Sequence, residues 1–197
     1  MKLFYSGASP FVRKVMATAI AAGVVDRIEK APTNPWESPP DLLAQNPLAK
    51  LPCLVTDDGL ALFDSPVICD YLASLGGNAA FLPWSGPARW QVLKQQAIAD
   101  GIMDAAIIRR NEAARPEEEA RAKNIQRQRM IMSNGLAVLE AAPPADQIDL
   151  GTISIACCLG YLDFRFADEP WRSSHPALDR WFTAFSQHRE IAETAPA

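Results

Sequence analysis

The chain has 197 residues, of which 49% are hydrophobic and 21% charged, and its formal net charge is −4. This length suits one large domain or two small ones with a substantial core. A slightly acidic chain whose basic residues concentrate in neither half argues against a nucleic-acid partner, and no apolar run approaches the roughly 20 residues that a membrane-spanning helix needs.

The first predicted element is a short strand, KLFYS (residues 2–6), and a helical pattern follows from Pro10 to Ala22. Ser9 is a favoured N-cap and Pro10 suits the first helical position, so the pair can simply start the helix. A hydroxyl at a helix N-terminus can also stabilise an anion, such as a thiolate. The local sequence leaves both interpretations open.

The rest of the first 77 residues continues to alternate strand and helix. VVDRIEKA (24–31) predicts a second strand, and DLLAQN (41–46) a short helix. LPCLVTDDGLALF (51–63) predicts a hairpin with its turn at two aspartates and a glycine. DSPVICDYLASLGG (64–77) predicts a helix with Ser65 as its cap. The expected order is therefore β-α-β-α-β-β-α.

The composition changes after this point. Residues 78–86, NAAFLPWSG, have the character of a linker, and no strand pattern is convincing beyond them. We expect an all-helical domain over 87–197. Its predicted helices are Pro87–Ala114, one starting near Pro116, the very apolar 151–165 with Asp149 as its N-cap, and the shorter 175–187.

The cysteines and histidines give no sign of a metal site or a disulfide framework. The chain has four cysteines without a C-x-x-C motif, and its two histidines lie far apart. Cys53, Cys69, Cys157 and Cys158 fall in apolar patterns, where free cysteine behaves as a small hydrophobe, so we assign none as a nucleophile. Because the N-terminus has the pattern of a strand, we expect no secretory signal, and we predict a reduced, cytoplasmic protein.

Two motifs within this β-α-β-α-β-β-α plus all-helical arrangement carry a family resemblance. NPLAKLPCL (46–54) and FDSP (63–66) are similar to motifs of the cytosolic glutathione S-transferases, and SPFVRK (9–14) is a third similar segment. ADGIMDA (99–105) and GYLDFR (160–165) resemble a bacterial branch of the family that has a serine at the first helix start. The resemblance implies a thioredoxin-like domain over 1–77 that binds glutathione. In that family the proline of the first motif is cis, and the preceding residue pairs with glutathione through its backbone. Leu51 and Pro52 take these places.

The same resemblance assigns roles to the two helix starts. Ser65 and the N–H groups around it would hold the γ-glutamyl carboxylate of glutathione, and Asp64 would lie near its ammonium group. Ser9 would donate to the glutathione sulfur. Glutaredoxin-like branches have a cysteine at that position, so Ser9 argues against thiol transfer through the protein's own cysteine.

Other candidates have less specific support. Phe11 could border the site or pack in the core, Lys50 could approach the glycyl carboxylate or be a solvated base, and Asn34 and Trp36 lie in a loop that contacts the tripeptide in other members. In the first long helix one face carries a further group that could form a wall of the second-substrate pocket, a dimer contact or an ordinary packing face: Asp100, Met103, Asp104 and Ile107.

Five residues carry the remaining expectations. Asp100 could also reach a glutathione amine across a dimer, and Arg13 and Lys14 suggest surface or interdomain contacts rather than chemistry. Two positions depart from the family pattern. Ala49 replaces a glycine, which is mild unless a positive φ is required, and Thr152 replaces an aspartate in a capping box.

The resemblance implies a cytoplasmic, homodimeric enzyme whose co-substrate is reduced glutathione. Its thiolate would attack a small, partly apolar electrophile, as in detoxification, or reduce a peroxide or a disulfide, without a metal or an organic redox cofactor. An alternative from another class is a non-catalytic interaction or regulatory module built on the same fold.

Overall fold

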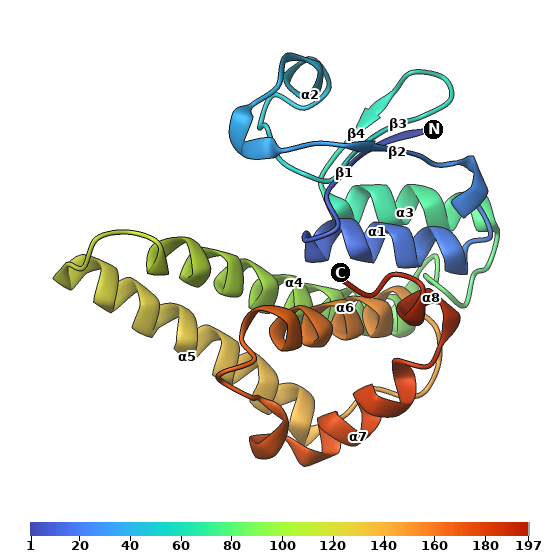
Figure 1. The fold of residues 1–197 in the computed structure, drawn as a ribbon. Helices are drawn as coiled ribbons and strands as arrows, with labels where there is room; N and C mark the ends of the chain where they lie inside the picture. The colour runs from blue at the N-terminus through green and yellow to red at the C-terminus, as the bar shows by residue number, and fades with distance from the viewer. Residues whose placement is uncertain (197) are drawn as a thin grey trace.

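The computed structural model describes residues 1–196 and has a small mixed sheet followed by a helical domain (Figure 1). The N-terminal part contains β1 (Lys2–Tyr5), α1 (Pro10–Ala21), β2 (Glu29–Pro32), α2 (Pro40–Gln45), β3 (Cys53–Val55), β4 (Ala61–Leu62) and α3 (Ser65–Gly76). The C-terminal part contains α4 (Gly86–Ala113), α5 (Glu119–Ala141), α6 (Leu150–Arg165), α7 (Pro176–Phe185) and α8 (Arg189–Ala192). The predicted architecture, a thioredoxin-like domain followed by an all-helical one, is confirmed.

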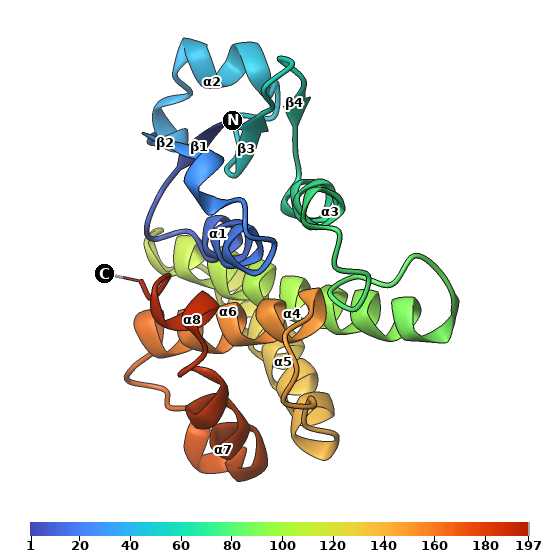
Figure 2. The same cartoon turned by 90° about the vertical axis from the view of Figure 1, so that its right-hand side faces the viewer.

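The four strands are ordered β2-β1-β3-β4. β1 runs parallel to β2 and antiparallel to β3, with Phe4 opposite Cys53, and β3 and β4 form the predicted hairpin. Figures 1 and 2 show α2 above the sheet, α1 and α3 below it, and the helical domain below α1. A small apolar cluster of Phe4, Leu42 and Cys53 fills the α2 side, because alternate residues of a strand face opposite sides.

The predicted second strand was placed too early and extended too far towards the N-terminus. Residues Val25–Arg27 form a 3-10 turn, and the strand runs from Glu29 to Pro32. Val24 is buried in the core, whereas Glu29 and Lys30 are exposed although they are in the strand. The apolar residues that suggested a strand lie in the turn before it, where Val24 packs in the core. The strand itself is set by its pairing with β1 rather than by apolar side chains.

The helices α1 and α3 pack side by side under the sheet at very short range. A side chain at Gly76 would place its Cβ 2.8 Å from the Ala22 carbonyl oxygen, so only glycine fits there.

The prediction that Ser65 caps α3 is wrong by one residue. Asp64 is the N-cap and accepts a hydrogen bond from the Ser65 N–H, so the Ser65 hydroxyl is not used as a cap.

The helical domain is built around α6, which packs against α1, α4, α7 and α8. Its capping box is complete. The Asp149 carboxylate accepts from the Thr152 N–H at 2.9 Å, and the Thr152 hydroxyl oxygen accepts from the Asp149 N–H at 3.0 Å. Thr152 therefore replaces the family aspartate without loss of the reciprocal contact. Within residues 1–196, none of the helices combines the length and the apolar character needed to cross a bilayer.

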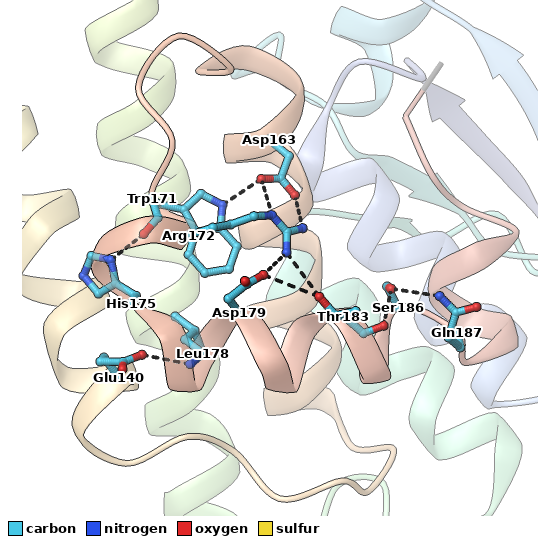
Figure 3. A network of polar contacts seen from close by, with 10 residues as sticks. All are labelled: Glu140, Asp163, Trp171, Arg172, His175, Leu178, Asp179, Thr183, Ser186 and Gln187. Atoms are coloured by element: carbon cyan, nitrogen blue, oxygen red, sulfur yellow. Dashed lines mark hydrogen bonds and ion pairs between the residues drawn. The ribbon is translucent and has the colours of Figure 1, made fainter.

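A polar network closes the end of the helical domain (Figure 3). Arg172 forms ion pairs with Asp163 and Asp179, and its guanidinium lies 4.9 Å from the Trp171 ring centroid. The carboxylate of Glu140, on α5, accepts the N–H groups of Ala177 and Leu178 at 2.9 and 2.8 Å. The first turn of α7 is thus capped by an anion from the same chain.

Candidate functional site

Ser9 lies at the point where β1 leads into α1. It is the N-cap of α1, and its Oγ accepts a hydrogen bond from the Val12 N–H at 3.3 Å. A hydroxyl has one donor and two acceptor positions, so capping uses an oxygen lone pair and leaves the proton free to donate. Within residues 1–196, the Ser9 hydroxyl donates no hydrogen bond; it only accepts the one from Val12. The two interpretations of Ser9, as a cap and as a donor to a sulfur, are therefore compatible.

The loop before β3 presents the backbone of Leu51. The Leu51–Pro52 peptide bond is cis, as the resemblance predicted. Sheet pairing begins at Cys53, and the N–H and C=O of Leu51 make no other main-chain hydrogen bond within residues 1–196. Both groups are thus available to pair with an extended peptide.

Asn46 holds this loop in shape, a role that the sequence analysis missed. Its side chain is 1% exposed, accepts the Leu48 N–H at 3.0 Å and donates to the Lys50 carbonyl at 2.9 Å. Ala49, between these contacts, has a φ of 52°. The glycine-to-alanine change was expected to be mild unless φ is positive. Because it is positive, alanine here carries a steric cost that glycine would not.

The start of α3 contains a polar atom with nothing to bind. Ser65 is completely buried, and its Oγ has no hydrogen-bond partner within the described chain. Buried hydroxyls are nearly always paired, because an unpaired one costs about 1–3 kcal/mol. The atom lies at a helix N-terminus, where backbone dipoles favour an anion. This is the arrangement expected of a carboxylate-binding site.

The sheet and α4 bring these groups to one region. β1 leads into Ser9, and the pairing of Phe4 with Cys53 places the Leu51 loop beside the end of β1. Partial burial of the carboxyl group raises the pKa of Asp104 on α4, Asp100 and Asp64 raise it further, and Lys50 and Lys14 lower it. The Leu51 loop, the start of α3 and the α4 face therefore carry charges that are close enough to act on one another, and Figure 2 shows α4 passing under α1.

The predicted α4 face divides into three parts. Asp100 accepts both of its hydrogen bonds from the Lys14 ammonium of the same chain, at 2.6 and 2.8 Å. Met103 is completely buried in the core, so the structure does not place it on a wall. Asp104 is exposed and Ile107 is half-buried, which leaves these two as the residues that could line a pocket.

The remaining candidates lie at the edge of the region. Trp36 is 76% exposed, and Asn34 caps its short 3-10 turn and donates to Glu37 at 2.7 Å. Lys50 is exposed, and Phe11 is half-buried with its ring centroid 5.6 Å from the Lys14 ammonium. The geometry leaves Asn34, Trp36 and Lys50 accessible to a ligand, and the half-buried Phe11 lies beside Lys14 with part of its surface exposed.

The four cysteines are buried, as their apolar sequence patterns predicted. All four are free and buried, and burial raises the pKa of Cys53, Cys69 and Cys157 to about 11 and that of Cys158 well above its ordinary value. Thiols with such pKa values are almost fully protonated at neutral pH, and the thiolate is the reactive form.

The surface hollows help to delimit the site. A hollow of about 10 Å³, which is room for one water, lies beside Ser9 and is bordered by Arg13, Tyr161 and Pro196. A larger hollow, about 470 Å³, lies at the opposite end of the sheet against Met1, Arg27 and Thr56, away from all the candidate residues. Within residues 1–196, histidine, cysteine and acidic side chains nowhere gather in a group of three that could hold a metal ion.

Two segments of the chain match models of known protein families. Residues 8–75 match the family described as glutathione S-transferase, N-terminal domain, and residues 122–184 match glutathione S-transferase, C-terminal domain. The uncharacterized GST-like protein YibF of Escherichia coli is 35% identical over 201 residues, which cover 100% of this chain and 98% of YibF.

Solved structures agree with this placement. A glutathione transferase family member from Pseudomonas fluorescens with bound glutathione is 40% identical, with a TM-score of 0.92 over 100% of this chain and 98% of that one. A second structure from the same organism, with bound S-(propanoic acid)-glutathione, has the same identity and coverage and a TM-score of 0.90. From the two matched domains and the full-length relatives, we conclude that the chain belongs to the glutathione S-transferase family.

Proposed function

We propose that the protein is a glutathione transferase. It binds reduced glutathione in its N-terminal domain and presents the thiolate to a second, partly apolar substrate in the space facing α4. The observation that carries this proposal is the buried Ser65 hydroxyl at the start of α3, which has no partner in the described part of the chain. Support comes from the similar structures that contain glutathione.

Glutathione is an extended tripeptide, and the available groups suit one. Its main chain would pair with the N–H and C=O of Leu51, as a short added strand. Its γ-glutamyl carboxylate would accept from the Ser65 hydroxyl, a charge-assisted hydrogen bond, and Asp64 would lie near its ammonium. The ligand would be bordered by five further residues: Phe11, Asn34, Trp36, Lys50 and Pro52.

The chemistry would come from the glutathione thiol. A free thiol has a pKa of about 8.5, so most of it is protonated at neutral pH. Ser9 would donate to the sulfur and lower that pKa, and the thiol proton would pass to solvent. The thiolate would then form a bond to an electrophilic carbon while a leaving group departs with its electron pair. Neither step requires a metal or an organic redox cofactor.

Two second-substrate classes are compatible with this thiolate. One is a carbon electrophile, and the other is a peroxide or disulfide that is reduced at the expense of glutathione. The similar structure with S-(propanoic acid)-glutathione holds glutathione with a carbon group on its sulfur, which supports the carbon electrophile. Asp104 and Ile107 would face such a group.

The test separates binding from turnover. We expect the protein to be retained on immobilised glutathione, to elute with free glutathione, and to accelerate the loss of chloride from 1-chloro-2,4-dinitrobenzene in the presence of glutathione. Absence of retention would refute the proposal as a whole. Retention without acceleration of this acceptor or of a peroxide would favour a non-catalytic interaction module.

We further propose a cytoplasmic homodimer. Exposed apolar side chains on α3 and at the start of α4 support self-association, with Val67 48% and Trp90 64% exposed, and the Asp70–Arg89 ion pair joins these elements. The free cysteines suit a reducing compartment. Sedimentation at micromolar concentration that detects only a 21.5 kDa species would exclude the dimer, and cell fractionation would test the location.

A further inference from the structure

A buried ion pair joins α1 of the N-terminal domain to α4 of the helical domain. The side chain of Lys14, on α1, is 0% exposed, and its Nζ lies 2.6 and 2.8 Å from the two carboxylate oxygens of Asp100 on α4. The Phe11 ring centroid is 5.6 Å from the same Nζ. Lys14 therefore has one anionic partner and one aromatic neighbour, and both lie within this chain.

Stability alone does not account for this pair. Removing two charges from water costs several kcal/mol per ion, and replacing a buried pair with apolar residues of similar volume is often neutral or stabilising. An apolar contact would, however, allow α1 and α4 to shift against each other. A charge pair with both oxygens engaged fixes the direction and the separation of the two helices.

The pair lies between groups with different candidate roles. Ser9, Leu51 and Ser65, which would hold glutathione, all belong to the N-terminal domain. Asp104 and Ile107, which would face the acceptor, belong to α4, and Asp104 follows Asp100 by one helical turn. A change in the separation of α1 and α4 would therefore move the candidate acceptor residues relative to the candidate glutathione contacts, which all belong to one domain.

We propose that the Lys14–Asp100 ion pair is a positioning contact that sets the α4 wall against the sulfur position held by α1, and so determines acceptor binding without contributing to glutathione binding. This inference rests on the proposed function. Lys14 and Asp100 act through the placement of Asp104 and Ile107, and neither needs to touch the reacting atoms.

The test compares two ligands on the same variants by calorimetry: glutathione, and S-hexylglutathione, whose alkyl chain occupies the acceptor space. The variants are Lys14→Met, Lys14→Arg as the conservative change, and the double change Lys14→Met/Asp100→Asn, which removes both charges and leaves neither unpaired. The matched control is Glu169→Gln, which removes the ion pair of Arg109, also on α4 but within the helical domain. The readout is the ratio of the two Kd values, because partial unfolding weakens both ligands by the same factor.

We expect wild type to bind S-hexylglutathione more tightly than glutathione. In Lys14→Met and in the double variant, glutathione Kd should stay within about twofold of wild type while the S-hexylglutathione Kd rises at least fivefold, about 1 kcal/mol. Lys14→Arg should restore part of the ratio, and Glu169→Gln should keep it. An unchanged ratio in the folded double variant would overturn the positioning role, whereas failure of wild type to bind glutathione would refute the proposed function itself.

Discussion

The first turns of α3 and α7 differ in how far the chain itself satisfies their polar groups. At α7, Glu140 of α5 uses both carboxylate oxygens to accept the Ala177 and Leu178 N–H groups, and Figure 3 shows the contact with Leu178. At α3, among residues 1–196, Asp64 accepts only the Ser65 N–H, and the buried Ser65 hydroxyl has no partner. One helix start is complete when the chain folds, and the other has an unused hydrogen-bonding group, as a ligand site would.

This contrast makes opposite predictions for the two places. A change at a completed helix start should lower the free energy of unfolding and leave glutathione binding intact. A change at the start of α3 should weaken glutathione binding and leave the free protein as stable as before. Each prediction below tests one side of that contrast.

The largest effect is expected for Ser65→Ala. It removes a hydrogen bond to a charged group, worth roughly 1.5–3 kcal/mol, so glutathione Kd should rise about tenfold or more in calorimetry. The unfolding free energy of the free protein should not fall, because the hydroxyl is unpaired before the ligand arrives. Ser74→Ala, at the other end of α3, is the control and should change neither quantity. A stability loss without an affinity loss would show that Ser65 is structural.

Ser9→Ala tests the second hydroxyl. Loss of a donor to the thiolate should raise the pKa of bound glutathione by about one to two units, at 1.36 kcal/mol per unit, with affinity mostly unchanged. An ultraviolet pH titration of the complex measures this. Ser9→Cys should shift activity toward thiol exchange, because cysteine can form a mixed disulfide. If the thiol of bound glutathione titrated at the same pH in wild type and in Ser9→Ala, Ser9 would not stabilise the thiolate, and its role would be limited to the capping contact with Val12.

Asp149→Ala tests a helix start that the chain completes by itself. It removes the carboxylate half of the buried α6 capping box and should lower the unfolding free energy by about 1–2 kcal/mol in chemical denaturation. Glutathione Kd should not change. Asp146→Ala, at an exposed neighbouring aspartate, is the matched control. If Asp149→Ala weakened glutathione binding in the folded protein, the separation of stability from binding would be lost.

The smallest effect is expected for Glu140→Gln, and it should depend on pH. Partial burial acts to raise the pKa of Glu140, but the N–H groups of Ala177 and Leu178, with His175 and Arg180, lower it below its ordinary value. A lowered folded-state pKa means that the carboxylate stabilises the fold above the unfolded pKa of about 4.3 and that this stabilisation is lost as pH falls through the folded-state pKa. Wild type should therefore exceed Glu140→Gln in stability at pH 7, and the difference should shrink on acidification. A constant difference from pH 7 to 3 would contradict the assignment.

Local signals were enough to predict most of the fold. Ser9-Pro10, the Asp57–Gly59 turn and the Asp149 cap each act within a few residues, and each was recognised in the sequence. The strand after α1 was misplaced because β1 pairing, rather than apolar content, sets it.

The contacts between distant elements could not be predicted. Lys14 and Asp100 are 86 residues apart, and Glu140 and Ala177 are 37 apart. The sequence predicted a surface or interdomain contact for Lys14 and did not indicate its partner. The positive φ of Ala49 and the role of Asn46 depend on the conformation of the loop before β3. The NPLAKLPCL motif indicates that the loop is present but does not predict that conformation.

The central claim is that the start of α3 binds the γ-glutamyl carboxylate. The most direct measurement is a calorimetric cycle in which glutathione, and an analogue whose γ-glutamyl carboxylate is replaced by hydrogen, are each titrated into wild type and Ser65→Ala. Groups in contact give non-additive effects. We predict that Ser65→Ala weakens glutathione about tenfold or more and leaves the affinity for the analogue unchanged; weakening of both ligands by the same factor would contradict the account.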